Sequence, residues 1–117
     1  QWDESETMKI KSLQGAYIAS SDLSKRRPFE AQYKTTYQST PPRIASLAYD
    51  GVSMMAILNK HFPSNPYALS ALTQGRGFAG VDGVFRLKSD GRCERKLAVL
   101  QLTPSGFVNV EGGGRTF

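Results

Sequence analysis

The stretch that decides the fold is Pro42-Arg-Ile-Ala-Ser-Leu-Ala-Tyr-Asp-Gly-Val-Ser-Met-Met-Ala-Ile-Leu58. It predicts a long helix with apolar side chains on more than one face. One set follows the spacing of a single buried stripe: Ile44, Leu47, Ala48, Met55 and Leu58. A second set falls outside that stripe: Ala45, Val52, Met54 and Ile57. A helix that is apolar on most sides has to be covered on most sides. The remaining chain is too short to do this easily, so we expect the helix to belong to a body larger than these 117 residues.

The composition is that of a globular protein. Of the 117 residues, 39% are hydrophobic and 21% are charged, which argues against disorder and allows one small domain with a modest core. No apolar run reaches the ~20 residues that a membrane-spanning helix needs. The sequence begins with Gln1, so we expect a processed, cloned or truncated end, and a missing upstream segment would have room for a targeting signal.

The chain is basic, with a net charge of +5 and an isoelectric point near 9.6. This permits weak attraction to acidic partners such as nucleic acid or anionic lipid. The densest basic runs are Lys25-Arg26-Arg27 and Arg92 with Arg95 and Lys96, and neither is interleaved with aromatic residues that would stack on bases. A solvated surface is therefore the preferred interpretation, and we expect no nucleic-acid partner. The alternative of a nucleic-acid-binding domain predicts binding that weakens steeply with salt.

The helices are marked by prolines. Pro28 suits the first turn of a helix over residues 27–37, in which Phe29, Tyr33 and Tyr37 share one face. The pair Pro41-Pro42 ends that helix and introduces the long one, which we expect to run to about residue 61. A shorter helix is expected over residues 66–75. Gly51 inside the long helix costs about 1 kcal/mol relative to Ala, and a close contact with another backbone would explain it.

The strands lie on either side of these helices. Residues 13–19 predict a short buried strand near the start of the chain, and residues 84–87, 97–102 and 107–110 predict three more near its end. Turns are expected at residues 89–91 and 104–106. The order of strand, three helices and then hairpins indicates an α+β domain or a piece of an α/β fold.

The sequence carries little that suggests catalysis. Gly75-Arg-Gly-Phe-Ala-Gly80 fits G-x-G-x-x-G, but it follows a helix and leads into a strand, the reverse of a dinucleotide site, so a Gly-rich loop is the better interpretation. His61 is the single histidine and Cys93 the single cysteine, and neither has partners at catalytic or zinc-ligand spacing. We predict no enzyme, no catalytic residue, no metal site and no cofactor. Some aromatic residues, among them Tyr17, Tyr49 and Phe78, could line a cleft or belong to the core.

Taken in order, several blocks resemble one family. They are Gln1-Trp2-Asp3, residues 13–19, residues 28–33 with Tyr37, residues 41–52, residues 77–86, Asp90-Gly91 and residues 98–102. The most specific are Ala48-Tyr-Asp-Gly-Val52 and Gly77-Phe-Ala-Gly-Val-Asp-Gly83. Together they resemble the C-terminal portion of type I periplasmic solute-binding proteins, the leucine/isoleucine/valine-binding-like family of extracellular ligand-binding receptors. The nearest branch resembles the bacterial lipoproteins described as penicillin-binding protein activators.

The resemblance implies an α/β fold in which two lobes close on a ligand and the chain crosses between them. Residues 1–117 would then be a C-terminal fragment that contributes to both lobes. The long helix would pack on the amino-terminal lobe, while the first strand and the last hairpin would lie in the other. The residues that the family places at the cleft correspond to Trp2, Asp3, Ile44, Ser46 and Tyr49. Asp3 would meet a ligand ammonium, and Trp2 and Tyr49 would form apolar walls. The alternative for Ile44 and Tyr49 is a place in the core of the lobe.

Two functions follow from the resemblance. The first is a non-enzymatic binding protein of the periplasm or cell envelope, which delivers an amino acid or similar small molecule to a membrane transporter. The second is an envelope lipoprotein, tethered to the membrane through a missing N-terminus, which activates cell-wall synthases by protein–protein contact. Stabilisation by a ligand would favour the first, and capture of a synthase without any response to ligand would favour the second.

Overall fold

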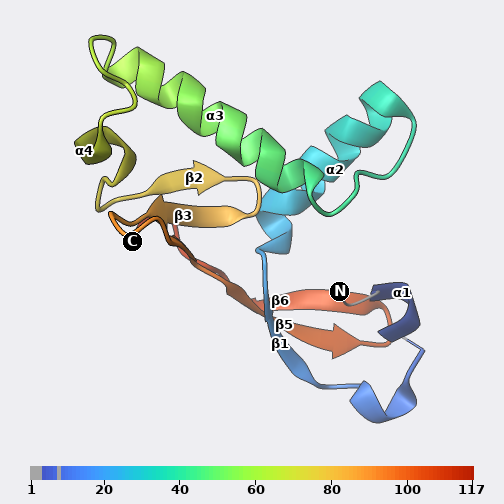
Figure 1. Ribbon diagram of the computed structural model, residues 1–117. Coiled ribbons are helices and arrows are strands. Elements are labelled where there is room, and N and C mark those ends of the chain that lie inside the picture. The colour runs from blue at the N-terminus through green and yellow to red at the C-terminus, as the bar shows by residue number, and fades with distance from the viewer. Residues whose placement is uncertain (1–3, 8) are drawn as a thin grey trace.

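The computed structural model describes residues 4–7 and 9–117, and it contains two antiparallel sheets and two long helices (Figure 1). The elements are α1 (Glu4–Thr7), a 3-10 helix (Lys11–Leu13), β1 (Tyr17–Ser20), α2 (Leu23–Tyr37), α3 (Ala45–His61), α4 (Leu69–Leu72), β2 (Phe78–Gly80), β3 (Gly83–Leu87), β4 (Cys93–Arg95), β5 (Ala98–Thr103) and β6 (Gly106–Glu111). The described structure is elongated, with principal extents of 55 × 31 × 21 Å.

The first sheet has the strand order β1-β5-β6. Alternate side chains of β5 are buried, as expected for a strand with one covered face. The core of this sheet consists of Ala98, Leu100, Leu102 and Phe107, with Leu13, Ile18 and Leu23 packed against it. We call this part of the molecule the β1–β5–β6 unit.

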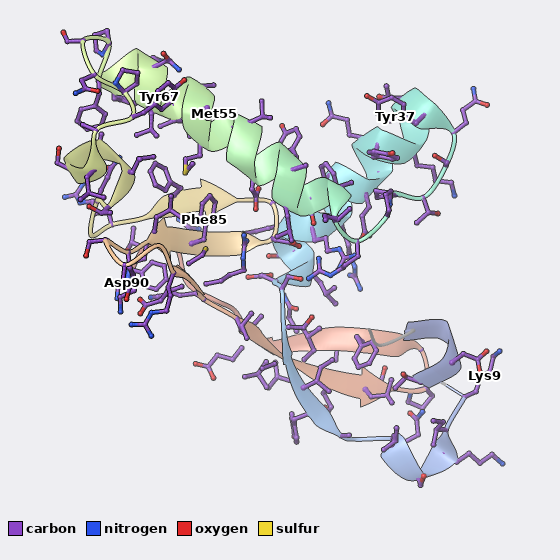
Figure 2. The ribbon with its side chains drawn as sticks, in the orientation of Figure 1. Lys9, Tyr37, Met55, Tyr67, Phe85 and Asp90 are labelled. Atoms are coloured by element: carbon purple, nitrogen blue, oxygen red, sulfur yellow. The ribbon has the colours of Figure 1, made fainter. Side chains whose placement is uncertain are left out.

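The second sheet has the order β2-β3-β4 and lies beneath α3 (Figure 1). Its core consists of Leu58, Ala71, Phe78 and Phe85, and the rings of Phe78 and Phe85 lie 5.6 Å apart. Figure 2 shows Phe85 on this sheet and Tyr37 at the end of α2 that points away from both sheets. We call α3, α4 and this sheet the α3–β3 unit. It shares no buried apolar residue with the β1–β5–β6 unit, so the described residues form two separate cores.

The chain connects the two units at a narrow joint. Ser21-Asp22 link β1 to α2, which leads on to α3, and Lys96-Leu97 link β4 to β5. After β6 the chain returns to the α3–β3 unit, where the Phe117 ring lies 4.4 Å from the guanidinium carbon of Arg86. The two units are thus held together by three neighbouring segments of chain rather than by a shared core.

Several predicted elements are confirmed and others differ. Strands β3, β5 and β6 and the end of α3 at His61 lie where the sequence places them, within one residue. The strand expected over residues 13–19 is shorter and later, because Leu13 belongs to a 3-10 turn. The helix expected over residues 66–75 is reduced to four residues. The short strands β2 and β4 were not predicted.

Helix α2 begins four residues earlier than predicted. Asp22 caps it by accepting a hydrogen bond from the Ser24 N–H, so a stronger start signal than Pro28 lies upstream. Pro28 consequently occupies the second turn of the helix and not the first.

Helix α3 differs from the prediction in the face that it buries. Its fully buried residues are Ser46, Asp50 and Leu58, while the stripe expected to be inside is mostly exposed. The exposed large apolar residues at its N-cap and along its length are Ile44, Leu47, Tyr49, Val52, Met55 and Ile57. The prediction of a buried stripe is therefore wrong for these 117 residues. The exposed apolar side chains are nevertheless consistent with the expectation that this short chain cannot cover all the apolar faces of the helix.

The explanation offered for Gly51 is also wrong, because nothing lies within 4 Å of the place that a Cβ would occupy there. Gly80, by contrast, occupies a position where only a residue without a side chain fits. A Cβ on Gly80 would overlap the carboxylate of Asp50, which is buried on the inner face of α3.

These two glycines give a matched prediction. Gly80→Ala should destabilise the protein by about 1–3 kcal/mol, because it forces Asp50 to move in a packed site. Gly51→Ala should stabilise it by roughly 0.5–1 kcal/mol, because the helix gains a better former and meets no obstacle. Urea unfolding followed by circular dichroism measures both. Destabilisation by Gly51→Ala, or no effect of Gly80→Ala, would contradict the packing described here.

Candidate functional site

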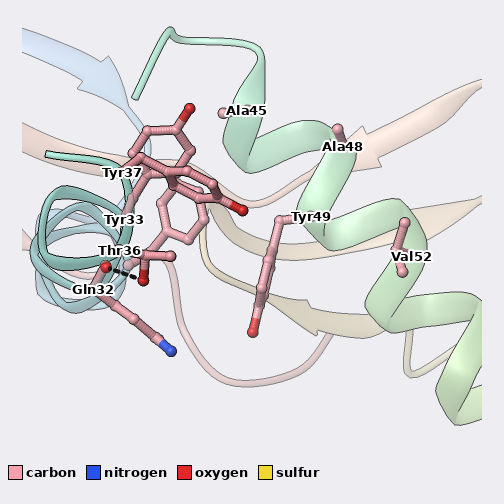
Figure 3. Close-up of a pocket in the computed structure, with 9 residues that line it drawn as sticks. Gln32, Tyr33, Thr36, Tyr37, Ala45, Ala48, Tyr49 and Val52 are labelled. Atoms are coloured by element: carbon pink, nitrogen blue, oxygen red, sulfur yellow. Dashed lines mark hydrogen bonds between the residues drawn. The ribbon is translucent and has the colours of Figure 1, made fainter. Parts of the chain in front are cut away.

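An apolar groove lies between α2 and α3 and is lined in part by Tyr49, one of the predicted site residues (Figure 3). Its volume is about 420 Å³. The residues that line it are Phe29, Gln32, Tyr33, Thr36 and Tyr37 from α2, and Ala45, Ala48, Tyr49 and Val52 from α3. We call it the α2–α3 groove.

The spacing of the aromatic residues explains the wall on the α2 side. Phe29, Tyr33 and Tyr37 recur every four residues, so their rings lie in a row along one helix face. Ring centroids are 6.1 Å apart for the first pair and 4.6 Å for the second. This confirms the shared face that the sequence predicts. Tyr49 of α3 joins the row, with its ring centroid 5.2 Å from that of Phe29.

The chemistry of the groove is apolar with a few neutral polar groups. None of the nine lining residues is charged. The Thr36 hydroxyl is already engaged, because it donates to the Gln32 carbonyl oxygen at 3.0 Å. The groove therefore suits an aromatic or aliphatic surface, whereas the ammonium and carboxylate groups of an amino acid would have to find their partners outside it.

A network of hydrogen bonds lies below the groove, at the start of α3. Arg43 donates from one nitrogen to both carboxylate oxygens of Asp82, each at 2.9 Å, and from the other to the Ser21 hydroxyl at 3.0 Å. The Ser46 hydroxyl lies 2.7 Å from the same carboxylate. Asp82 is only 1% exposed and occupies the turn between β2 and β3. The network thus connects the joint, the start of α3 and this turn.

The pKa of Asp82 shows that the network stabilises its charge. Burial by itself raises the pKa of this carboxyl, because it disfavours the ionised form. Hydrogen bonds from Ser46 and Arg43, together with the positive charges of Arg43 and Arg26, act in the opposite direction. Their sum lowers the pKa below its usual value.

A second buried carboxylate lies one helical turn further along α3. Asp50 accepts hydrogen bonds from the Val81 N–H at 2.7 Å and from Arg95 at 3.2 Å. It is 2% exposed. The two carboxylates together fasten the polar face of α3 to the hairpin of β2 and β3.

The predicted site residues that the structure describes do not lie together in one site. Trp2 and Asp3 lie outside the described residues. Tyr49 lines the groove, and Ile44 lies at the start of α3 with 70% of its surface exposed. Ser46 points inward to Asp82 and is 2% exposed. Of the described candidates, only Tyr49 therefore belongs to the α2–α3 groove, and the ligand-binding role of all five remains a prediction.

The sequence pattern does not identify Arg43, Asp50, Asp82 or Arg95 as partners. One signal was present, since Asp50 is a charged residue inside an otherwise apolar helix, and such a residue is rarely buried unless it is paired. Among the residues that the structure describes, no group of three or more His, Cys, Asp or Glu side chains is placed to hold a metal ion. No helix in that part of the chain has the length and apolarity needed to cross a membrane.

The lowered pKa of Asp82 predicts a dependence of stability on pH. A carboxyl whose pKa is lower in the folded state contributes stability above the unfolded pKa of about 4, and this contribution is lost as the pH falls through the folded value. Asp82→Asn should cost about 1–3 kcal/mol at pH 7, because it removes the charged partner of Arg43. The difference from the unaltered protein should shrink as the pH is lowered below about 4.

Urea unfolding at several values between pH 7 and pH 2.5 measures this difference. Asp90→Asn, the same chemical change at an exposed turn, is the control and should have a much smaller effect at pH 7. A constant difference between Asp82→Asn and the unaltered protein over the whole range would show that the charge of Asp82 does not stabilise the fold.

Comparison with known proteins finds similar structures but no match at the level of sequence. The sequence matches no protein-family model and no curated protein. Its structure is similar to that of a protein assigned as a branched-chain amino acid ABC transporter from Rhodospirillum rubrum, with a TM-score of 0.72 and 20% identity over 86% of this chain and 32% of that one. It is also similar to the leucine-binding protein LivK of Thermotoga maritima, with a TM-score of 0.52 and 16% identity over 85% and 31% of the two chains.

A third similar structure is an ABC-transporter solute-binding protein of R. palustris in complex with benzoate, with a TM-score of 0.53 and 17% identity over 92% and 32% of the two chains. The chain thus spans about a third of the length of each of these structures. This confirms the resemblance at the level of the fold. The 117 residues have the fold of one part of a type I periplasmic binding protein.

Proposed function

We propose that the chain is the C-terminal part of a two-lobed, non-enzymatic solute-binding protein of the cell envelope. In this proposal the complete protein binds an amino acid or a similar small molecule and delivers it to a membrane transporter. The observation that carries the proposal is the fold match, which includes 86% of this chain and only 32% of the similar structure from Rhodospirillum rubrum.

The two units of the structure support a division between lobes. The β1–β5–β6 unit and the α3–β3 unit have separate cores and are connected through the joint. We assign the first unit to one lobe and the second to the other. The Ser21-Asp22 and Lys96-Leu97 segments would then be crossings between lobes.

The exposed face of α3 supports a larger body around the second unit. Val52 is 63% exposed, and Leu47, Met55 and Ile57 lie with it among the large apolar side chains exposed on this helix. Contiguous exposed apolar residues on a globular protein mark surfaces that other protein covers. We propose that the rest of the amino-terminal lobe covers this face.

The position of Tyr49 supports a role for the start of α3 in ligand binding. Its ring is half exposed and lies in the groove beside Phe29, where it would offer an apolar wall to a ligand. Following the resemblance, Ile44 would lie at the cleft, Trp2 would offer a further apolar wall and Asp3 would bind a ligand ammonium. Ser46 would act indirectly, since its hydroxyl lies against Asp82 and helps to hold Arg43 at the joint.

Two of the similar structures are named for branched-chain amino acids or leucine, and the third holds benzoate. These names support a small-molecule ligand and an ABC-type transporter as partners. None of them favours a lipoprotein that activates cell-wall synthases, so solute binding is the function we propose.

The test uses the protein purified from its native source, with L-leucine and benzoate as separate probes. A ligand present at ~100 times its dissociation constant should raise the free energy of unfolding by about 2.7 kcal/mol. Tyr49→Ala should weaken that binding by roughly tenfold, which corresponds to 1.4 kcal/mol from a lost aromatic wall.

Tyr67→Ala is the matched control, because Tyr67 is also half exposed but bonds to Asn59 at the far end of α3. It should leave the affinity unchanged. No stabilisation by either probe at millimolar concentration would count against an amino acid or aromatic acid as the ligand. Equal weakening by both substitutions would remove Tyr49 from the proposed site.

A further inference from the structure

We propose that a small polar pocket between α2 and the start of β6 binds inorganic phosphate. In this site Arg26 and Arg27 donate hydrogen bonds to the anion, and Glu30 accepts one from its O–H group. The pocket shares no lining residue with the α2–α3 groove. The inference therefore goes beyond the proposed function and does not depend on it.

The pocket has a volume of about 210 Å³. The residues that line it are Leu23, Arg26, Arg27 and Glu30 from α2, and Ser105, Gly106 and Phe107 from the turn between β5 and β6 and the start of β6. We call it the arginine pocket. Pockets that bind drug-sized molecules have volumes of about 300–1,000 Å³, so this one suits a smaller ligand. Its three charged side chains also set it apart from the uncharged α2–α3 groove.

Arg26 shows that the basic run at the start of α2 is more than a solvated surface. Its side chain is only 14% exposed, and its Nε lies 2.6 Å from a carboxylate oxygen of Glu30. This ion pair engages Nε, and the two terminal nitrogens of the guanidinium form no hydrogen bond with the described residues. They are therefore available as donors to a ligand in the pocket.

Arg27 brings a second positive charge to the same pocket. Among the residues that the structure describes, no carboxylate forms an ion pair with it. One of its terminal nitrogens lies 3.4 Å from the Phe107 carbonyl oxygen, a long hydrogen bond that leaves most of its N–H groups for a ligand. Guanidinium groups bind phosphate through pairs of charge-assisted hydrogen bonds, so two of them at one small pocket favour a tetrahedral oxyanion.

Glu30 determines which oxyanion the pocket prefers. One of its carboxylate oxygens faces Arg26, and its side chain is 37% exposed, so the other oxygen can accept a hydrogen bond from a ligand. Inorganic phosphate keeps an O–H group at neutral pH, whereas a phosphate monoester is mostly a dianion and sulfate has no proton to donate. Glu30 would repel the last two, and it would accept a hydrogen bond from the first.

The turn between β5 and β6 adds a second acceptor. The Thr103 hydroxyl donates to the Gly106 carbonyl oxygen at 2.7 Å, so in its 3.1 Å contact with the Ser105 hydroxyl it has to accept. Ser105 consequently donates to Thr103, and its own oxygen is left as an acceptor at the pocket. The arginine pocket thus combines donors for the anionic oxygens with acceptors for the proton.

The experiment is isothermal titration calorimetry at pH 7 and constant ionic strength, with sodium phosphate, sodium sulfate and glycerol 3-phosphate as separate probes. Phosphate should bind to the unaltered protein about tenfold more tightly than either of the others, because it alone satisfies Glu30. Tighter binding of glycerol 3-phosphate than of phosphate would contradict the role given to Glu30.

Two variants test the residues of the pocket. Arg27→Gln should weaken phosphate binding by about tenfold, since it removes a charge-assisted donor. Arg92→Gln is the matched control, because Arg92 undergoes the same change of charge in an exposed turn outside the pocket, where it pairs with Asp90. It should leave the affinity unchanged. Glu30→Gln exchanges an acceptor for a group that can also donate, so sulfate should then bind as tightly as phosphate.

Circular dichroism of each variant establishes that it is folded before its affinity is compared. Equal affinities of the unaltered protein for phosphate and sulfate would overturn the proposal, as would the absence of phosphate binding at millimolar concentration. Equal weakening by Arg27→Gln and Arg92→Gln would show a general effect of net charge in place of a site. A negative result with L-leucine and benzoate leaves this proposal intact, because those probes test the α2–α3 groove.

Discussion

The rest of the structure depends on two buried carboxylates at the inner face of α3, one on the helix itself and one in the turn between β2 and β3. Asp50 and Asp82 are almost completely inaccessible, and each is compensated by an arginine, Arg95 and Arg43 respectively. Removing a carboxylate from water is costly unless charged and polar groups replace the lost solvation, so these residues fix which side of α3 faces the hairpin of β2 and β3. Gly80 lies against Asp50 because any larger residue would displace that carboxylate.

The orientation of α3 has a direct consequence for its other faces. With Ser46, Asp50 and Leu58 inside, the apolar residues that remain point outward or toward the α2–α3 groove. Full burial of such a side chain stabilises a fold by about 1.5–3 kcal/mol. The described chain does not gain most of this stabilisation, because these side chains stay exposed. This exposed surface is what the proposal of a longer two-lobed protein has to cover, and the similar structure from Rhodospirillum rubrum is about three times as long as the part that this chain matches.

The sequence predicts helices and strands correctly where the pattern that defines them lies within a few neighbouring residues. Strands β3, β5 and β6, and the end of α3 before Pro63, follow from apolar runs and turn residues within a few positions. The row of aromatic rings on α2 follows from a four-residue spacing. The inward face of α3 was missed because periodicity assumes that the apolar side is buried, and the partners of its acidic residues are distant in sequence. Arg43 and Asp82 are 39 positions apart, and Asp50 and Arg95 are 45 apart. The start of α2 differs from the prediction because the Asp22 cap begins the helix upstream of Pro28.

The measurement that tests the central claim most directly is hydroxyl-radical footprinting of Met55, which is exposed on the outward face of α3. Oxidation of a methionine follows its exposure to solvent. The account predicts that Met55 is oxidised several times more slowly in the protein purified from its native source than in the 117-residue chain, because the rest of a two-lobed fold covers it. Equal rates of oxidation in the two samples would contradict the account.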